Sequence, residues 1–90
     1  MKILEPVDDT LSTQVGEEII LLSMREANPK YFGLHGSAIR MWQLIETKTH
    51  SEEMICAVLQ EEFEAPEEQV RQDVANTLNG LESRNLIRRR

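Results

Sequence analysis

The sequence has a single cysteine, Cys56, which excludes a disulfide within the chain. One unpaired thiol is typical of a reducing compartment, so we expect a cytoplasmic protein. The longest apolar run, residues 54–59, is far shorter than the roughly 20 residues that a membrane-spanning helix needs. The N-terminal segment has one lysine, Lys2, and then Glu5, Asp8 and Asp9 among its residues, and it contains no apolar signal core. We therefore expect neither export nor membrane association.

Basic residues are also scarce, since 10 Lys and Arg face 16 Asp and Glu and the formal net charge is −6. This balance argues against electrostatic capture of nucleic acid or anionic lipid. The four glycines are isolated, so no glycine-rich phosphate loop is present. A chain of 90 residues forms one domain, 1–90, that buries about two-thirds of its unfolded surface. Within it we expect residues 1–9 to be a loose N-terminal segment.

The first third of the chain has the pattern of short strands. Residues 11–15 are a short polar-apolar stretch, residues 18–24 have Ile19-Ile20-Leu21-Leu22 at their centre, and residues 30–34 contain Tyr31 and Phe32. Gly16 separates the first two runs, and Asn28-Pro29 is a turn signal between the second and third. Short links between consecutive strands predict an antiparallel meander.

From residue 37 onward, the apolar residues recur at helical spacing. The pattern predicts helices from Ser37 to Glu46, from the capping-box sequence Thr49–Glu52 onward, and from Pro66 to about Arg84. The expected buried residues of the second and third helices are Ile55, Val58, Leu59, Phe63, Val70, Val74, Leu78 and Leu81. Asn85 is a candidate left-handed cap, and Leu86-Ile87-Arg88 a short closing strand. The fold class is therefore α+β: a winged-helix-like domain with a three-stranded antiparallel sheet followed by three helices.

The residues that could support catalysis are few and scattered. Cys56 lies within an apolar helical run, where a buried structural thiol is the usual outcome. His35 and His50 each lie at a helix start, where we expect capping or solvent exposure. One cysteine and two histidines on separate elements give no zinc spacing. We expect no enzyme activity, no metal and no cofactor.

Two charge patterns leave alternatives open. Residues 51–70 contain seven Glu and no Lys or Arg, which fits either a solvated surface or a docking face for a basic partner. A winged-helix shape also raises DNA binding through the third helix. That helix, 67–84, has a net charge of −2, and phosphates would repel it. Arg84 and residues 88–90 are basic, but they cluster at the C-terminus and fit a solubilising tail.

The third predicted strand is an edge of the meander. An edge strand presents unpaired backbone N–H and C=O groups, which proteins normally protect. This strand contains Tyr31, Phe32 and the small Gly33, with only Lys30 as a guarding charge. The edge is either an ordinary protected one or a place where an extended peptide pairs.

Three segments of the chain together form a pattern found in one protein family. They are Tyr31-Phe32-Gly33-Leu34-His35, the helix Ser37-Ala38-Ile39-Arg40-Met41-Trp42-Gln43-Leu44-Ile45, and Asp73-Val74 with Leu78, Leu81 and Leu86-Ile87. In these segments, and from about Gly16 to Ile87, the chain resembles the PqqD family, small peptide chaperones that recognise precursors of ribosomally made, modified peptides. His35 stands where the family often has Asn, and Thr47-Lys48-Thr49 replaces a usual Gly. The first difference affects a helix cap and the second a turn.

The resemblance implies a non-catalytic domain that binds a leader peptide as an added strand between the third strand and the third helix. The residues implied to bind the leader are Lys30, Tyr31, Phe32, Gly33, Leu34, Gln69, Asp73, Val74, Thr77 and Arg84. Asp73 is the best candidate for a polar contact, with a plain surface charge as its alternative.

The resemblance also suggests the enzymes served. A free-standing chain of this kind resembles the version in lasso-peptide pathways, which delivers the precursor to a leader peptidase. The alternative is a partner of a radical-SAM enzyme, as in pyrroloquinoline quinone biosynthesis, and a winged-helix DNA-binding regulator is less favoured.

Overall fold

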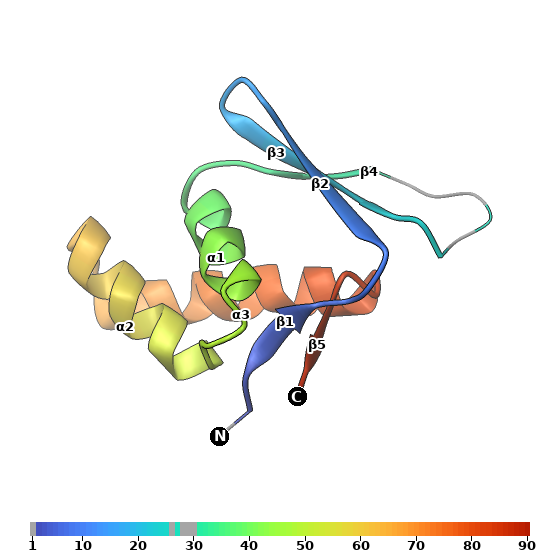
Figure 1. The fold of residues 1–90 in the computed structure, drawn as a ribbon. Coiled ribbons are helices and arrows are strands. Elements are labelled where there is room, and N and C mark those ends of the chain that lie inside the picture. Colours follow the sequence, from blue (N-terminus) through green and yellow to red (C-terminus); the bar gives the residue numbers. More distant parts are fainter. Residues whose placement is uncertain (1, 26, 28–30) are drawn as a thin grey trace.

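The computed structural model describes residues 2–25, 27 and 31–90. The chain has an α+β architecture in which a three-stranded sheet lies across one side of three helices (Figure 1). The expected fold class is confirmed. The predicted turn at Asn28-Pro29 lies outside the described residues.

The sheet contains strands β2 (Thr10–Val15), β3 (Glu18–Ser23) and β4 (Tyr31–Leu34), in the order β2-β3-β4 and antiparallel throughout. A two-residue turn joins β2 to β3, with Val15 paired to Glu18. Gly16 has a φ of 61° and Glu17 has no positive φ, which is the type II′ hairpin pattern. Glycine at the first turn position explains why the hairpin closes here.

The two faces of the sheet differ because side chains alternate along each strand. Ile19 and Leu21 of β3 are buried against the helices, together with Leu34 of β4. Ile20 and Leu22 point to the other face and are only half-buried. The helices therefore cover one face of the sheet.

The helices are α1 (Ser37–Glu46), α2 (Glu52–Phe63) and α3 (Glu67–Ser83). The predicted core stripe of α3, four residues from Val70 to Leu81, is buried. Asn85 has a φ of 58°, so the expected left-handed residue after α3 is confirmed.

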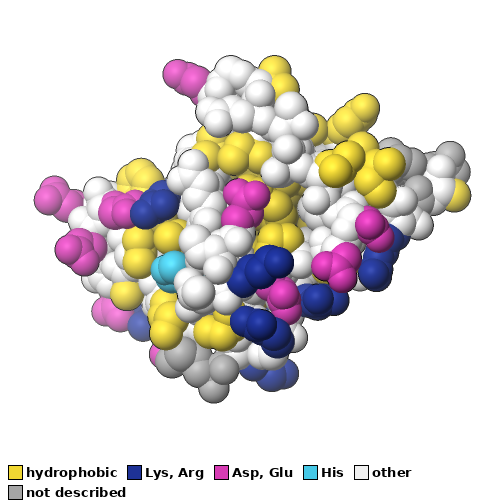
Figure 2. Space-filling view, viewed as in Figure 1, with side chains coloured by type: hydrophobic (Ala, Val, Ile, Leu, Met, Phe, Trp, Pro, Cys, Tyr) yellow, Lys and Arg dark blue, Asp and Glu magenta, His cyan; other side chains and the backbone are white. Residues whose placement is uncertain are grey.

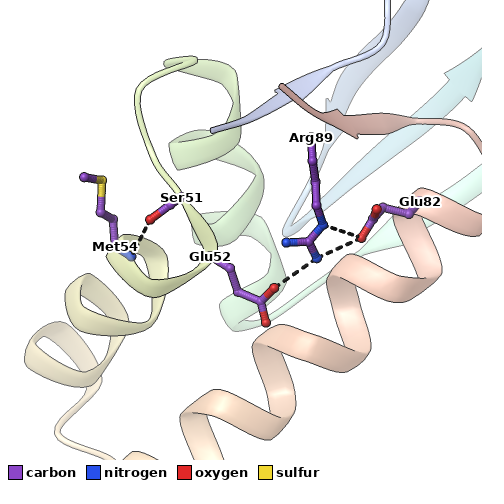
Figure 3. Close-up of polar contacts among 5 residues, drawn as sticks. All are labelled: Ser51, Glu52, Met54, Glu82 and Arg89. Atoms are coloured by element: carbon purple, nitrogen blue, oxygen red, sulfur yellow. Dashed lines mark hydrogen bonds and ion pairs between the residues drawn. The ribbon is translucent and has the colours of Figure 1, made fainter. Parts of the chain in front are cut away.

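Two details of α2 differ from the predictions. The hydroxyl of Ser51, rather than that of Thr49, caps the helix by accepting a hydrogen bond from the backbone N–H of Met54 at 3.2 Å (Figure 3). Phe63, expected in the core, is 52% exposed. It is the last residue of α2, where Glu64 turns into the left-handed conformation and ends the helix.

The N-terminal segment is not loose, contrary to expectation. Strand β1 (Leu4–Pro6) pairs antiparallel with β5 (Ile87–Arg89) in a separate two-stranded sheet. Leu4 is fully buried, and its N–H donates to the carbonyl of His50 at 2.9 Å. The closing strand was predicted one residue early, and its partner β1 was missed because three residues are too few to show an alternating pattern.

The three C-terminal arginines are ion-paired rather than forming a free basic tail. Arg89 donates to Glu52 at the start of α2 and to Glu82 near the end of α3, each at 2.9 Å (Figure 3). These contacts raise the pKa of the Arg89 guanidinium. Arg88 and Arg90 lie 3.5 and 3.6 Å from the buried carboxylate of Glu5. The C-terminus therefore connects β1, α2 and α3.

Candidate functional site

Among the described residues, strand β4 pairs only with β3, so its other backbone edge is free. The hairpin turn shows which of its residues face outward. Val15 and Glu18 close a tight turn and so form a hydrogen-bonded pair. Hydrogen-bonded pairs alternate along an antiparallel ladder, and the N–H of Met24 indeed donates to the carbonyl of Asp9 at 2.9 Å. Even-numbered residues of β3 therefore bond to β2, and odd-numbered ones bond to β4.

The same alternation continues into β4. Ile19 pairs with Leu34 and Leu21 pairs with Phe32, so Phe32 and Leu34 direct their N–H and C=O groups toward β3. Tyr31 and Gly33 direct theirs away from the sheet. These are the groups available to an additional strand.

A groove of about 330 Å³ lies between this free edge and α3. It is lined by Phe32, Gly33, Leu34 and His35 on the strand side, by Ser37 and Ala38 at the start of α1, and by Asp73, Asn76 and Thr77 on α3. The outward N–H and C=O of Gly33 thus belong to a residue that lines a hollow large enough for peptide side chains.

A second, more apolar cavity of about 190 Å³ adjoins the groove, and Ser37 and Asp73 line both. Its other walls are Met41, Leu59, Phe63, Ala65, Gln69 and Val70. Exposed Phe63 at this cavity leaves an aromatic surface beside the groove. The two hollows together extend from β4 past the start of α1 to the junction of α2 and α3.

Phe32 connects β4 to the C-terminal part of α3. The guanidinium of Arg84 lies 4.8 Å from the centre of its ring, within the range of a cation–π contact. A Cβ at Gly80 would stand 3.5 Å from the ring's Cζ, which is an ordinary van der Waals distance, so the ring lies beside α3 at Gly80. Phe32 therefore lines the groove, and Arg84 packs on its ring.

The charges near the groove are few. Asp73 is exposed and lines both hollows, so its carboxylate can accept hydrogen bonds from a bound ligand. His35 Nδ1 lies 3.9 Å from the carboxylate of Glu18, and its side chain is 76% exposed. Gly36, rather than His35, is the N-cap of α1, and no side chain caps that helix.

The structure places most of the predicted leader-binding residues around these hollows. Phe32, Gly33, Leu34, Asp73 and Thr77 line the groove, Gln69 lines the adjoining cavity, and Arg84 packs on Phe32. Tyr31 offers backbone groups at the edge, but its side chain belongs to the opposite face. Lys30 lies outside the described residues.

Val74 was predicted to bind the leader, but its side chain is fully buried in the core and is not accessible to a ligand. Four further residues line the groove although the sequence did not predict them: His35, Ser37, Ala38 and Asn76. Asn76 is three residues beyond Asp73, so helical spacing could have identified it. The start of α1 carried no comparable signal.

The residues considered for catalysis, Cys56, His35 and His50, lie in different surroundings. Cys56 is buried, and burial raises the pKa of its thiol. The Nδ1 of His50 lies 2.9 Å from the Thr47 hydroxyl and 3.1 Å from that of Thr49, in the turn before α2. In the described residues, no group of three His, Cys, Asp or Glu side chains could hold a metal ion. No helix described here is long and apolar enough to cross a membrane.

Comparison with known proteins places this geometry in a family. The family model described as "Coenzyme PQQ synthesis protein D (PqqD)" matches residues 18–87. The chain belongs to the PqqD family. Its fold is similar to that of a solved structure entitled "TbiB1 in Complex with the TbiA(beta) Leader Peptide", with a TM-score of 0.79 and 24% sequence identity over 92% of this chain and 93% of that one. No curated protein matches the chain.

Proposed function

We propose that this PqqD-family chain is a non-catalytic peptide chaperone that binds the leader of a ribosomally made precursor peptide. The leader adds as a strand to the free edge of β4, and its side chains enter the groove against α3. The observation that carries the proposal is the free edge of β4 beside a side-chain-sized groove. A protein of similar fold has been solved with a leader peptide bound, which supports the proposal.

Backbone pairing alone would not hold a peptide. Each main-chain hydrogen bond contributes about 0.5–1.5 kcal/mol, whereas ordering the peptide backbone costs about 1–2 kcal/mol per residue. Net affinity must therefore come from apolar side chains of the leader that enter the hollows lined by Phe32, Leu34 and Met41. We expect leader sequences with alternating apolar residues to bind.

The antiparallel sheet favours antiparallel addition of the leader, since that pairing is slightly more stable per residue. The C-terminal half of the bound segment would then pair near Tyr31, and the N-terminal half would pass His35. Asp73, which borders both hollows, is placed to fix the register by accepting a hydrogen bond. The proposed contacts thus include the backbone of Tyr31 and Gly33.

Two observations weigh against the DNA-binding alternative. The exposed surface of α3 is acidic, with Glu67, Glu68 and Asp73 all exposed. Arg88, Arg89 and Arg90, which could have supplied a phosphate-binding patch, each lie within 4 Å of a carboxylate. A recognition helix of this sign would raise the free energy of duplex binding.

The enzyme served is proposed to be a leader peptidase of a lasso-peptide pathway. The alternative is a radical-SAM enzyme. This alternative is supported by the description of the family model, which names coenzyme PQQ synthesis. Neighbouring genes for a peptidase and an asparagine-synthetase-like cyclase would favour the first, and a radical-SAM gene would favour the second.

Fluorescence anisotropy tests the binding function directly. The purified chain is titrated against the labelled leader encoded in its gene cluster and against a random DNA duplex. We expect a Kd for the leader of about 1 μM or lower, equivalent to about −8 kcal/mol, and no measurable duplex binding. Duplex binding without leader binding would refute the proposal.

Amide chemical shifts recorded with and without leader then locate the site. The largest changes are expected at residues 31–35, 69–77 and the start of α1. Changes centred on β2 or on α2 would place the peptide on another surface.

A further inference from the structure

The face of the sheet that points away from the helices carries an apolar patch. Leu11, Leu22 and Tyr31 form one cross-strand row, because Leu22 is paired with both of the others. Leu11 is 52% exposed and Tyr31 74% exposed. Ile20 lies next along this face, and Val15, which is 60% exposed, lies at its end.

The helices of the described chain pack on the opposite face, where Ile19 and Leu21 are buried. Hydrophobic side chains also gather over the sheet region in the space-filling view (Figure 2). A contiguous exposed apolar patch of this kind marks an interaction surface. The row on the sheet is thus a second surface, separate from the groove.

Charges at both ends of the hairpin border this apolar row. Asp8 and Asp9 lie at one end, and Glu17 and Glu18 lie at the other; all four are exposed. Arg25, whose Nε is 3.6 Å from a carboxylate oxygen of Asp9, offsets one of them. Four carboxylates against one guanidinium leave a rim with a net charge of −3 (residues 8–25).

We propose that this outer face of the β2-β3-β4 sheet docks the enzyme that acts on the leader, through an enzyme surface with an apolar centre and a Lys/Arg rim. The proposal rests on the proposed function, because the two surfaces meet at β4. Tyr31 contributes backbone groups to the leader edge and its side chain to the outer row. The acidic rim selects a basic partner and steers its approach.

Leader binding should extend this face. The side chains of an added strand alternate, so half of them enter the groove and the other half continue the outer face beside Tyr31 and Gly33. The enzyme would then contact a composite surface of sheet and leader. We therefore expect the enzyme to bind the leader-loaded chain more tightly than the free chain.

The test measures two affinities for each variant with purified components: the chain, its leader, and the enzyme that processes the precursor in the producing cell. Leu11→Thr combined with Val15→Thr removes apolar surface and places β-branched side chains, which suit a strand, at both positions. Met54→Thr on α2 is the control, since Met54 is also an exposed apolar residue, at 40%. Glu17→Lys reverses one rim charge.

The sheet double variant should keep the leader Kd within twofold of the wild-type value and lose at least tenfold in affinity of the loaded chain for the enzyme. Glu17→Lys should weaken enzyme binding most at low salt, whereas Met54→Thr should leave it unchanged. Unchanged enzyme affinity in the double variant would overturn the proposal. The proposal would also be overturned if analytical ultracentrifugation showed that the double variant loses only self-association, because a second copy of the chain would then be the partner that covers the outer face.

The proposed function, leader binding, fails by a different observation from the one that overturns the docking proposal. A wild-type chain that binds no leader would refute leader recognition. In that case, the comparison of the double variant with Met54→Thr for direct enzyme binding would still decide whether the sheet face is the docking surface.

Discussion

Replacing Gly33 by proline should weaken leader binding with little effect on the fold. The outward N–H of Gly33 is available to an added strand, and proline removes it. The backbone of Gly33 has no positive φ, and a Cβ there would meet the flexible carboxylate of Glu18 at 3.4 Å. An edge strand tolerates proline where its N–H faces solvent.

The expected loss follows from the hydrogen bond. A carbonyl of the bound leader that lacks its partner in the groove costs about 1–3 kcal/mol, which is roughly a 5- to 150-fold increase in Kd. Fluorescence anisotropy with the labelled leader measures this change. Thermal unfolding monitored by circular dichroism checks that each variant remains folded.

Three variants serve as controls. Gly33→Ala adds the Cβ but keeps the N–H, so it should bind like the wild type. Ser12→Pro removes an outward N–H from β2, the opposite edge of the same sheet, and should also leave leader binding unchanged. Phe32→Pro should instead lower stability, because that N–H faces β3. Equal losses of leader affinity in Gly33→Pro and Ser12→Pro would refute strand addition at β4.

Three further predictions concern single side chains. Asp73→Ala should weaken leader binding by about 1–3 kcal/mol, because the carboxylate of Asp73 is expected to accept a hydrogen bond shielded from water. Isothermal titration calorimetry measures the change, and an unchanged affinity would show that Asp73 is only a surface charge. Arg89→Ala should lower the free energy of unfolding, measured by urea denaturation, by about 1–2 kcal/mol, because it leaves the half-buried carboxylates of Glu52 and Glu82 unpaired. Arg88→Ala should lower it by less, because the side chain of Arg88 is 49% exposed. Cys56→Ala should cost about 1 kcal/mol or a little more through a small cavity and leave leader binding intact, so loss of binding in a folded variant would contradict a structural role. Burial raises the folded-state pKa of this thiol, so its contribution to stability is complete below the unfolded pKa and disappears as pH rises through the folded value. Between those two pKa values, the wild-type melting temperature should therefore fall more steeply with pH than that of Cys56→Ala.

Much of the fold followed from local patterns in the sequence. The α3 stripe from Val70 to Leu81 is long enough for helical periodicity to be unambiguous, and all four of its apolar residues are buried. Gly16, between the polar-apolar stretch 11–15 and the apolar run 19–22, was sufficient to locate the hairpin. These features are local in sequence, so neighbouring residues carry the necessary information.

What the sequence did not show depends on contacts between distant residues. The pairing of β1 with β5 brings Glu5 opposite Arg88 from the other end of the chain. The ion pairs of Arg89 likewise join residues 37 and 7 positions away, Glu52 and Glu82. For the site, the lining residues on α3 could be predicted from helical spacing, but the contribution of Ser37 depended on how α1 packs beside β4.

The sheet has two edges, and the side chains beside each one explain why the leader is assigned to β4. Strand β2 is longer and also has a free edge, so it offers a peptide as many main-chain bonds. The β2 side chains on the helix-facing side are Thr10, Ser12 and Gln14, which give a peptide no apolar contact. Main-chain bonds there would only offset the cost of ordering the peptide. At β4, Phe32 and α3 enclose a groove, so the same bonds would be combined with burial of apolar side chains, and we therefore expect the leader to bind at that edge.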